Sequence, residues 1–111
     1  MALTYRLNTR FQDTYTTAAS GTIVVGYNAF KSYSMQVKGT GASPTSWTVS
    51  LRGSLDGVNF TTIFQHKNTD GDGVIIFSGA TFYPAIFLQT VCDAVVLGSA
   101  TNIVVDCLAV P

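Results

Sequence analysis

Strict alternation of apolar and polar residues in two segments limits the fold of this chain more than any other feature. Residues 32–38 and 47–52 both place large apolar side chains at every second position. These side chains are Tyr33, Met35 and Val37 in the first segment and Trp47, Val49 and Leu51 in the second. Because successive side chains of a strand point to opposite faces of a sheet, the alternation predicts two half-buried antiparallel strands.

The rest of the chain divides into short segments separated by polar, Gly-rich turns. Val, Ile and Thr make up 33 of the 111 residues, and β-branched side chains favour strands over helices. Further strands are expected at 3–8, 21–26, 60–65, 74–77, 85–91 and 102–110. This spacing is typical of an all-β fold, an antiparallel β-sandwich of jelly-roll or immunoglobulin-like type. We assign residues 21–111 to the sandwich domain and residues 1–20 to an N-terminal arm or lead-in strand.

Charged residues are scarce and balanced, which argues against several classes of partner. The chain has 6 Lys and Arg, 6 Asp and no Glu, so its formal net charge is +0 at pH 7. It lacks the basic cluster that binds nucleic acid or an anionic membrane. No apolar run approaches the ~20 residues that cross a bilayer, and the first residues lack the apolar stretch of a secretory signal. We expect a soluble protein that binds neither nucleic acid nor membrane.

Side chains suited to catalysis are few. His66 is the only histidine, and we expect it to be solvated at the end of a strand. No nucleophile turn of the G-x-S-x-G kind is present, and a hydrolase would need His66 to reach a Ser and an Asp. We therefore expect no enzyme, no catalytic residue and no cofactor, and replacing His66 with Ala should leave every activity intact.

Two acidic residues and two cysteines are the remaining candidates for metal or redox chemistry. Asp70 and Asp72 bring two carboxylates together, but the segment lacks the third Asp and the Glu that complete a calcium loop, so we expect a polar turn, with a weak cation site as the alternative. Cys92 and Cys107 do not suffice for a tetrahedral zinc site. We expect free, buried thiols, with a disulfide as the alternative.

Most aromatic residues occupy strand positions, where we expect them to fill the core. They are Tyr33, Trp47, Phe60, Phe64, Phe77, Phe82 and Phe87. The alternative is an exposed aromatic strip that stacks on sugars. Its only candidate is the loop 68–73, if that loop lies near Trp47 or Phe64.

The last strands carry apolar residues on both faces, which is more than a solitary sandwich can bury. If Ile103 and Val105 face the core, Val104, Leu108 and Val110 lie on the opposite face. That face requires a cover, which the arm, a second copy or another protein would provide. Arg and aromatic residues of the arm are typical of protein–protein hot spots, although the arm alternatively forms an edge strand of its own sandwich. The candidate interface comprises Tyr5, Arg6, Arg10, Phe11, Tyr15, Val104, Leu108 and Val110.

Several segments taken together resemble a known group of proteins. They are Tyr33–Gly41 (YSMQVKGTG), Trp47–Phe60 (WTVSLRGSLDGVNF), Tyr83–Leu88 (YPAIFL) and the valine-rich last strand. In this order they resemble small β-sandwich structural proteins of tailed bacteriophages, which serve as capsid decoration (cement) subunits and as tail or baseplate modules. The resemblance covers roughly residues 21–110.

The resemblance implies an interaction protein without an active site. A decoration subunit would lie on the capsid surface of the virion, after assembly in the host cytoplasm, as a homo-oligomer that bridges major capsid proteins. Its partners would be the major capsid protein, copies of itself, or both. The competing function is a tail, baseplate or fibre module that binds a host-surface carbohydrate or other tail proteins.

Overall fold

This computed structural model describes residues 9–77 and 84–110. These residues contain nine strands and one turn of 3-10 helix, joined by loops. All strand pairings are antiparallel. No helix among these residues is long and apolar enough to span a membrane. The elements are β1 (Thr9–Tyr15), β2 (Ala19–Ser20), β3 (Val24–Phe30), β4 (Ser32–Gly39), β5 (Ser46–Ser54), β6 (Thr61–Lys67), η1 (Asn68–Asp70), β7 (Ile75–Phe77), β8 (Ala85–Val96) and β9 (Ile103–Val110).

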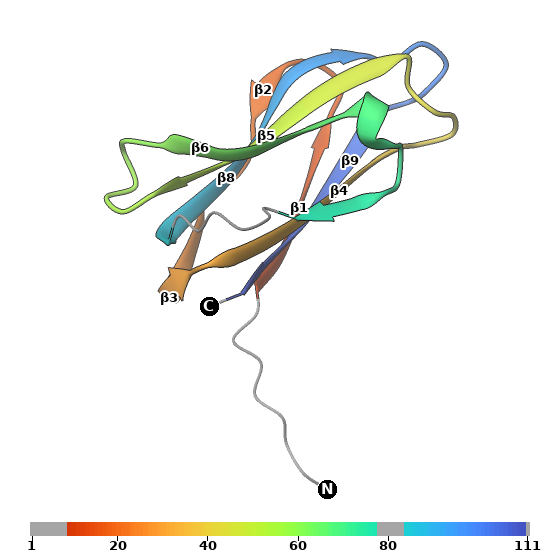
Figure 1. Cartoon of the computed structure of the whole chain (residues 1–111). Helices are drawn as coiled ribbons and strands as arrows, with labels where there is room; N and C mark the ends of the chain where they lie inside the picture. Colours follow the sequence, from red (N-terminus) through yellow and green to blue (C-terminus); the bar gives the residue numbers. More distant parts are fainter. Residues whose placement is uncertain (1–8, 78–83, 111) are drawn as a thin grey trace, which may run out of the picture.

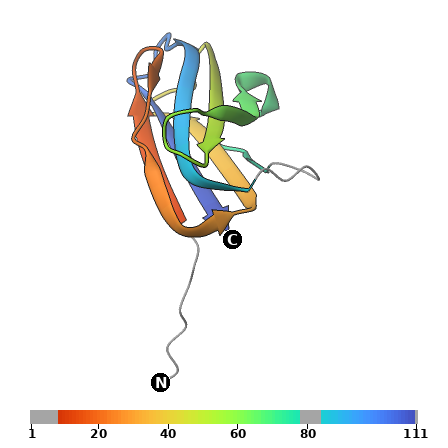
Figure 2. The same ribbon diagram turned by 90° about the vertical axis from the view of Figure 1, so that its left-hand side faces the viewer.

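The strands form two sheets that pack face to face, so the predicted all-β antiparallel sandwich is confirmed (Figures 1 and 2). Sheet A has the order β1-β9-β4-β7. Sheet B has the order β2-β8-β5-β6, and β3 also pairs with β8. The last strand of the chain therefore lies inside sheet A, between β1 and β4.

The core lies between the inner faces of the two sheets, and the alternating segments supply much of it. All six apolar residues of the two alternating segments are at most 1% exposed. The same alternation holds in β9, where the inward side chains are buried. Those inward residues are Ile103, Val105, Cys107 and Ala109, whereas Val104, Leu108 and Val110 point outward. The apolar second face of β9 is thus a real feature of the molecule.

Strand β8 is longer than predicted, because it continues through Cys92 to Val96. A β-bulge makes this possible: Thr48 pairs with Ala94 and Val49 with Cys92, so Asp93 is the extra residue. Both cysteines are free and buried, which confirms that prediction. Burial raises the pKa of the Cys107 thiol well above its ordinary value.

The described part of the expected arm, residues 9–20, contributes the edge strand β1 to sheet A and the short strand β2 to sheet B. Residues 9–15 form β1, which pairs with β9 along its whole length. Tyr15 is therefore not available to a partner, because its side chain is 5% exposed. Phe11 also points inward and packs, partly buried, against the core. The expected strand at 3–8, with Tyr5 and Arg6, and the expected core residue Phe82 lie outside the described residues.

A buried network joins the edge of sheet A to sheet B. The Tyr15 hydroxyl donates a hydrogen bond to the carbonyl of Thr90 at 3.0 Å, and the Thr90 hydroxyl donates to Asp13 Oδ2 at 2.6 Å. Asp13 Oδ1 also accepts from the backbone amide of Thr22 at 3.2 Å. Because Asp13 pairs with the buried Val105, its carboxylate lies on the inner side of the edge strand.

Candidate interaction surface

The outward side of sheet A, which we call the A face, carries the apolar residues of β9 together with neighbours from β1, β4 and β7. The strand register arranges these side chains in rows that cross the sheet. The three rows are Arg10, Leu108, Ser34 and Phe77; Gln12, Asp106, Gln36 and Ile75; and Thr14, Val104 and Lys38.

Three large apolar side chains of the A face are exposed to solvent. Phe77 is 72% exposed, Ile75 63% and Leu108 38%. Val104 and Val110 are half-buried on the same face. Because full burial of such a side chain contributes about 1.5–3 kcal/mol, a partner that covers this face gains free energy.

Four polar side chains in the middle of the A face, Arg10, Gln12, Gln36 and Asp106, form hydrogen bonds within the chain. Asp106 accepts hydrogen bonds from the Arg10 guanidinium at 2.7 Å and from the Gln12 amide at 3.2 Å. Gln36 donates to the backbone carbonyl of Gly73 at 2.5 Å. These bonds satisfy part of the hydrogen-bonding capacity of these side chains, and a docking protein would have to supply acceptors for the remaining donors of Arg10.

Two adjoining hollows along β4 and β9 form a groove in this face, which we call the A-face groove. The first hollow, of about 290 Å³, is lined by the apolar Leu108 and Ile75 and by Arg10. The second, of about 380 Å³, is more polar. Gln36 and Asp106 line both hollows, so the two hollows lie next to each other on either side of this pair.

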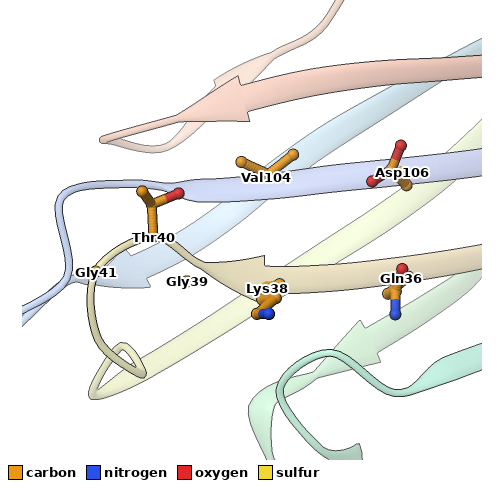
Figure 3. Close-up of a pocket in the computed structure, with 7 residues that line it drawn as sticks. All are labelled: Gln36, Lys38, Gly39, Thr40, Gly41, Val104 and Asp106. Atoms are coloured by element: carbon orange, nitrogen blue, oxygen red, sulfur yellow. The ribbon is translucent and has the colours of Figure 1, made fainter.

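Figure 3 shows the second hollow, where Val104 and Asp106 on β9 lie beside Gln36 and Lys38 on β4. The loop that follows β4 closes one end of it with Thr40. Lys38 is exposed and forms no ion pair with any described residue. The groove therefore offers apolar surface together with one uncompensated positive charge.

A buried histidine fixes the turn that leads into β7. His66 is 0% exposed, so the prediction of a solvated residue is wrong. The reason is that β6 continues to Lys67 and pairs His66 with the buried Val49. The His66 ring packs edge-on against Trp47, with 4.7 Å between ring centroids, and its Nε2 lies 3.2 Å from the Val74 carbonyl oxygen.

The two carboxylates of the 68–74 turn have structural partners. Asp70 Oδ2 accepts the backbone amide of Lys67 at 2.9 Å and lies 3.1 Å from His66 Nδ1, and these interactions hold the pKa of Asp70 below its ordinary value. Asp72 accepts the backbone amide of Gly39 at 2.9 Å. In residues 9–77 and 84–110 no cluster of three or more His, Cys, Asp or Glu side chains could hold a metal ion.

Two arrangements considered from the sequence involve side chains that the structure buries. The ring nitrogens of His66 face Asp70 and the Val74 carbonyl, and no serine is among the partners that the described residues provide. Of the two aromatic residues considered for a sugar platform near the 68–73 loop, Trp47 is only 1% exposed and cannot stack on a sugar, whereas Phe64 is partly buried against the core. We take the groove in the A face, where exposed apolar side chains lie beside charged ones, as the candidate recognition surface.

Sequence reasoning missed part of this surface. Phe77, expected in the core, and Ile75 both point outward, because they pair with Ser34 and Gln36, which face solvent on β4. Residues 74–77 form a continuous apolar run without alternation, so the sequence carries no signal for which side is buried.

Fold and surface together define a small antiparallel β-sandwich protein with one partly apolar outer face. No family model and no curated protein matches the sequence. Among solved structures, the chain is similar to the SPBc2 prophage-derived protein YomS, with a TM-score of 0.60 and 15% identity over 100% of this chain and 99% of that one. It is also similar to the Yersinia pseudotuberculosis-derived mitogen YPM, with a TM-score of 0.56 and 10% identity over 96% and 88%. At these identities the similarity is one of fold.

Proposed function

We propose that this chain is a non-enzymatic structural protein of a tailed phage, and that it acts as a capsid decoration subunit. The observation that carries the proposal is the A face, on which Phe77, Ile75 and Leu108 are exposed around polar groups that already have partners. A surface of this composition suits contact with another folded protein. The partners would be the major capsid protein and further copies of this chain, and the location would be the capsid surface.

Two further observations support this proposal. The fold similarity to YomS spans essentially the full length of both chains, and that protein derives from a prophage. The formal net charge of +0 also suits dense packing of many copies better than attraction to DNA. On a shell, each copy needs to contribute only a modest contact energy, because many contacts act together.

The test is co-sedimentation of the purified chain with empty capsid shells of the phage that encodes it. We expect the wild-type chain to sediment with the shells. The double variant Leu108→Asp/Ile75→Asp should lose binding by about tenfold or more, because it introduces two charges into the contact. Val25→Asp is the matched control: Val25 is 61% exposed but belongs to sheet B, and this variant should bind as the wild type does.

Three results would contradict the proposal. A wild-type chain that does not sediment with the shells but does sediment with purified tails or baseplates would be a tail module. Binding to sugars on a glycan array, without binding to shells, would instead support a carbohydrate-binding module. Equal shell binding by the A-face variant and the Val25→Asp control would show that the A face is not the contact surface.

A further inference from the structure

The A-face groove defines the chemistry of the group that would fill it. Its first hollow, beside Leu108 and Ile75, suits an aliphatic side chain. Lys38 in the adjoining hollow has no ionic partner among the described residues, and the Arg10 side chain is 70% exposed although it pairs with Asp106. A segment that combines aliphatic side chains with a nearby carboxylate is therefore complementary to the groove in both polarity and charge.

The turn between β5 and β6 has this composition. Leu55 is 69% exposed and Val58 80%, and the carboxylate of Asp56 lies between them in the sequence. We call this turn, residues 55–59, the hairpin tip. It ends the β5–β6 hairpin at the left of Figure 1, and it belongs to sheet B, whereas the groove lies on the outer side of sheet A.

Hydrogen bonds hold the hairpin tip in one conformation. Asp56 Oδ1 accepts the backbone amides of Val58 and Asn59, each at 2.8 Å, and Asp56 Oδ2 accepts the Asn59 side-chain amide at 2.8 Å. These bonds hold the pKa of Asp56 far below its ordinary value, so its carboxylate is ionised at neutral pH. The Ser54 hydroxyl oxygen also accepts the Gly57 amide at 2.9 Å.

The backbone of the tip is restricted as well. Gly57 has φ 78°, and a Cβ there would lie 3.1 Å from the Phe87 ring, so glycine suits both the turn conformation and the close approach. A tip that is already ordered loses little conformational entropy when it docks. The chain thus presents two aliphatic side chains on a rigid support.

We propose that the hairpin tip of one copy docks into the A-face groove of a second copy. Leu55 and Val58 would cover Leu108 and Ile75, and Asp56 would face Lys38. This inference rests on the proposed role of the A face as an interface and names the occupant of its groove. Because the two contacting surfaces differ, each copy in a pair keeps one free tip or one free groove, and the association continues into a ring or a filament.

The test uses the purified full-length chain alone, with light scattering during size-exclusion chromatography over a concentration series. Wild type should grow beyond a monomer as concentration rises. The tip variant Leu55→Asp/Val58→Asp and the groove variant Leu108→Asp/Ile75→Asp should each remain monomeric. Val25→Asp, the matched control with a 61% exposed side chain, should assemble as wild type does.

Mixing the two defective variants gives the sharper result. The tip variant retains a normal groove and the groove variant a normal tip, so an equimolar mixture should form dimers and nothing larger. A mixture that stays monomeric while wild type assembles would overturn the proposal, as would a tip variant that assembles normally. Circular dichroism and a thermal melt of each variant establish that it is folded.

Lys38→Glu provides a second, milder variant on an exposed side chain. It should weaken assembly about tenfold at low salt, and the difference from wild type should shrink as salt screens the charges. An unchanged assembly constant would overturn the part assigned to Lys38.

Failure here is distinguishable from failure of the capsid proposal. A wild-type chain that remains a monomer at every concentration but sediments with shells overturns the tip-in-groove contact and leaves the decoration role in place. A chain that assembles through tip and groove but does not bind shells overturns the decoration role and supports the tip-in-groove contact.

Discussion

The outward phenylalanines of the two sheets differ in how far their own chain covers them. On sheet B, Phe87 is half-buried beneath the β5–β6 turn, where it lies against Gly57. On sheet A, Phe77 is 72% exposed. Both residues occupy outward strand positions and both are phenylalanine. Of these two residues, only Phe77 is left largely uncovered by the described residues and is accessible to a partner.

Polar groups reinforce this contrast. On sheet B, Arg52 Nε donates to Gln89 Oε1 at 2.8 Å, and its guanidinium lies 5.1 Å from the centre of the Phe60 ring. Gln89 in turn donates to the Gly21 carbonyl at 2.7 Å and is 7% exposed. On sheet A, Arg10 is 70% exposed and its ion pair with Asp106 is open to solvent. On sheet B these polar side chains are bonded to one another or to the backbone and are largely shielded, whereas on sheet A the ion pair is exposed, although sheet B also carries an exposed apolar residue, Val25.

The largest expected effect concerns His66, the buried histidine on β6. His66→Ala should lower the free energy of unfolding by about 2–4 kcal/mol, because it leaves a cavity beside Trp47 and removes the bond to the Val74 carbonyl. Urea denaturation measures the loss. Lys67→Ala, at the exposed next position, should change it by less than about 0.5 kcal/mol. Equal effects would mean that His66 does not anchor the turn before β7.

The free energy of unfolding should decrease in alkali. Burial raises the pKa of Tyr15 and of Tyr33 to about 12, above the value of about 10 in an unfolded chain. Because the folded state disfavours the phenolate, this contribution to stability is complete below about pH 10 and is lost as the pH rises towards 12. Urea midpoints between pH 9 and 12 should fall, and Tyr15→Phe should reduce the slope. A flat profile would contradict the assignment.

The two arginines separate the faces more directly. Arg52→Ala should cost about 1–1.5 kcal/mol, because it removes the bond to the buried Gln89 and the contact with the Phe60 ring. Arg10→Ala should cost less than about 0.5 kcal/mol, as is usual for an exposed ion pair. Chemical denaturation of both variants at the same salt concentration makes the comparison. The reverse order would mean that the exposed ion pair of Arg10 stabilises the fold more than the contacts of Arg52 do.

The smallest expected change belongs to the exposed phenylalanine. Phe77→Ser should alter the free energy of unfolding by no more than about 0.5 kcal/mol, because the side chain is largely in water already. Phe87→Ser, its counterpart on sheet B, should cost about 1–2 kcal/mol. Thermal melts of the two variants are sufficient, and similar losses would show that Phe77 contributes to the fold rather than to a contact surface.

The alternation of apolar and polar residues predicted the buried side of a strand where the pattern is clear. It gave no prediction where pairing with a strand distant in sequence determines which side is buried. Strands β4, β5 and β9 reveal their inward sides through period two, so the core and the apolar outer residues Val104, Leu108 and Val110 were predictable. Phe77 was not, because only its pairing with Ser34 on β4 turns it outward. His66 is buried because β6 reaches Lys67, and no local signal in the sequence indicates where that strand ends.

The candidate surface was predictable only in part for the same reason. Its β9 residues were identified from the sequence, and Arg10 also lies on it as expected. Tyr15 and Phe11 turned out to face inward, since β1 pairs with β9 from the first described residue and this register fixes every side chain of the strand. Lys38 and Ile75 enter the groove because β4 and β7 flank β9 on one side, a neighbourhood set by the strand order alone.

The carboxylate of Asp13 also affects how molecules meet when they are crowded. A foreign strand adding to the outer side of β1 would have to shield this inward-pointing charge from water, and such charges discourage the fusion of sheets into continuous ribbons. Backbone pairing between molecules is thereby disfavoured at this edge, whereas contacts through side-chain surfaces and loops are not. Contacts of that kind can form and separate again while every molecule keeps its native structure.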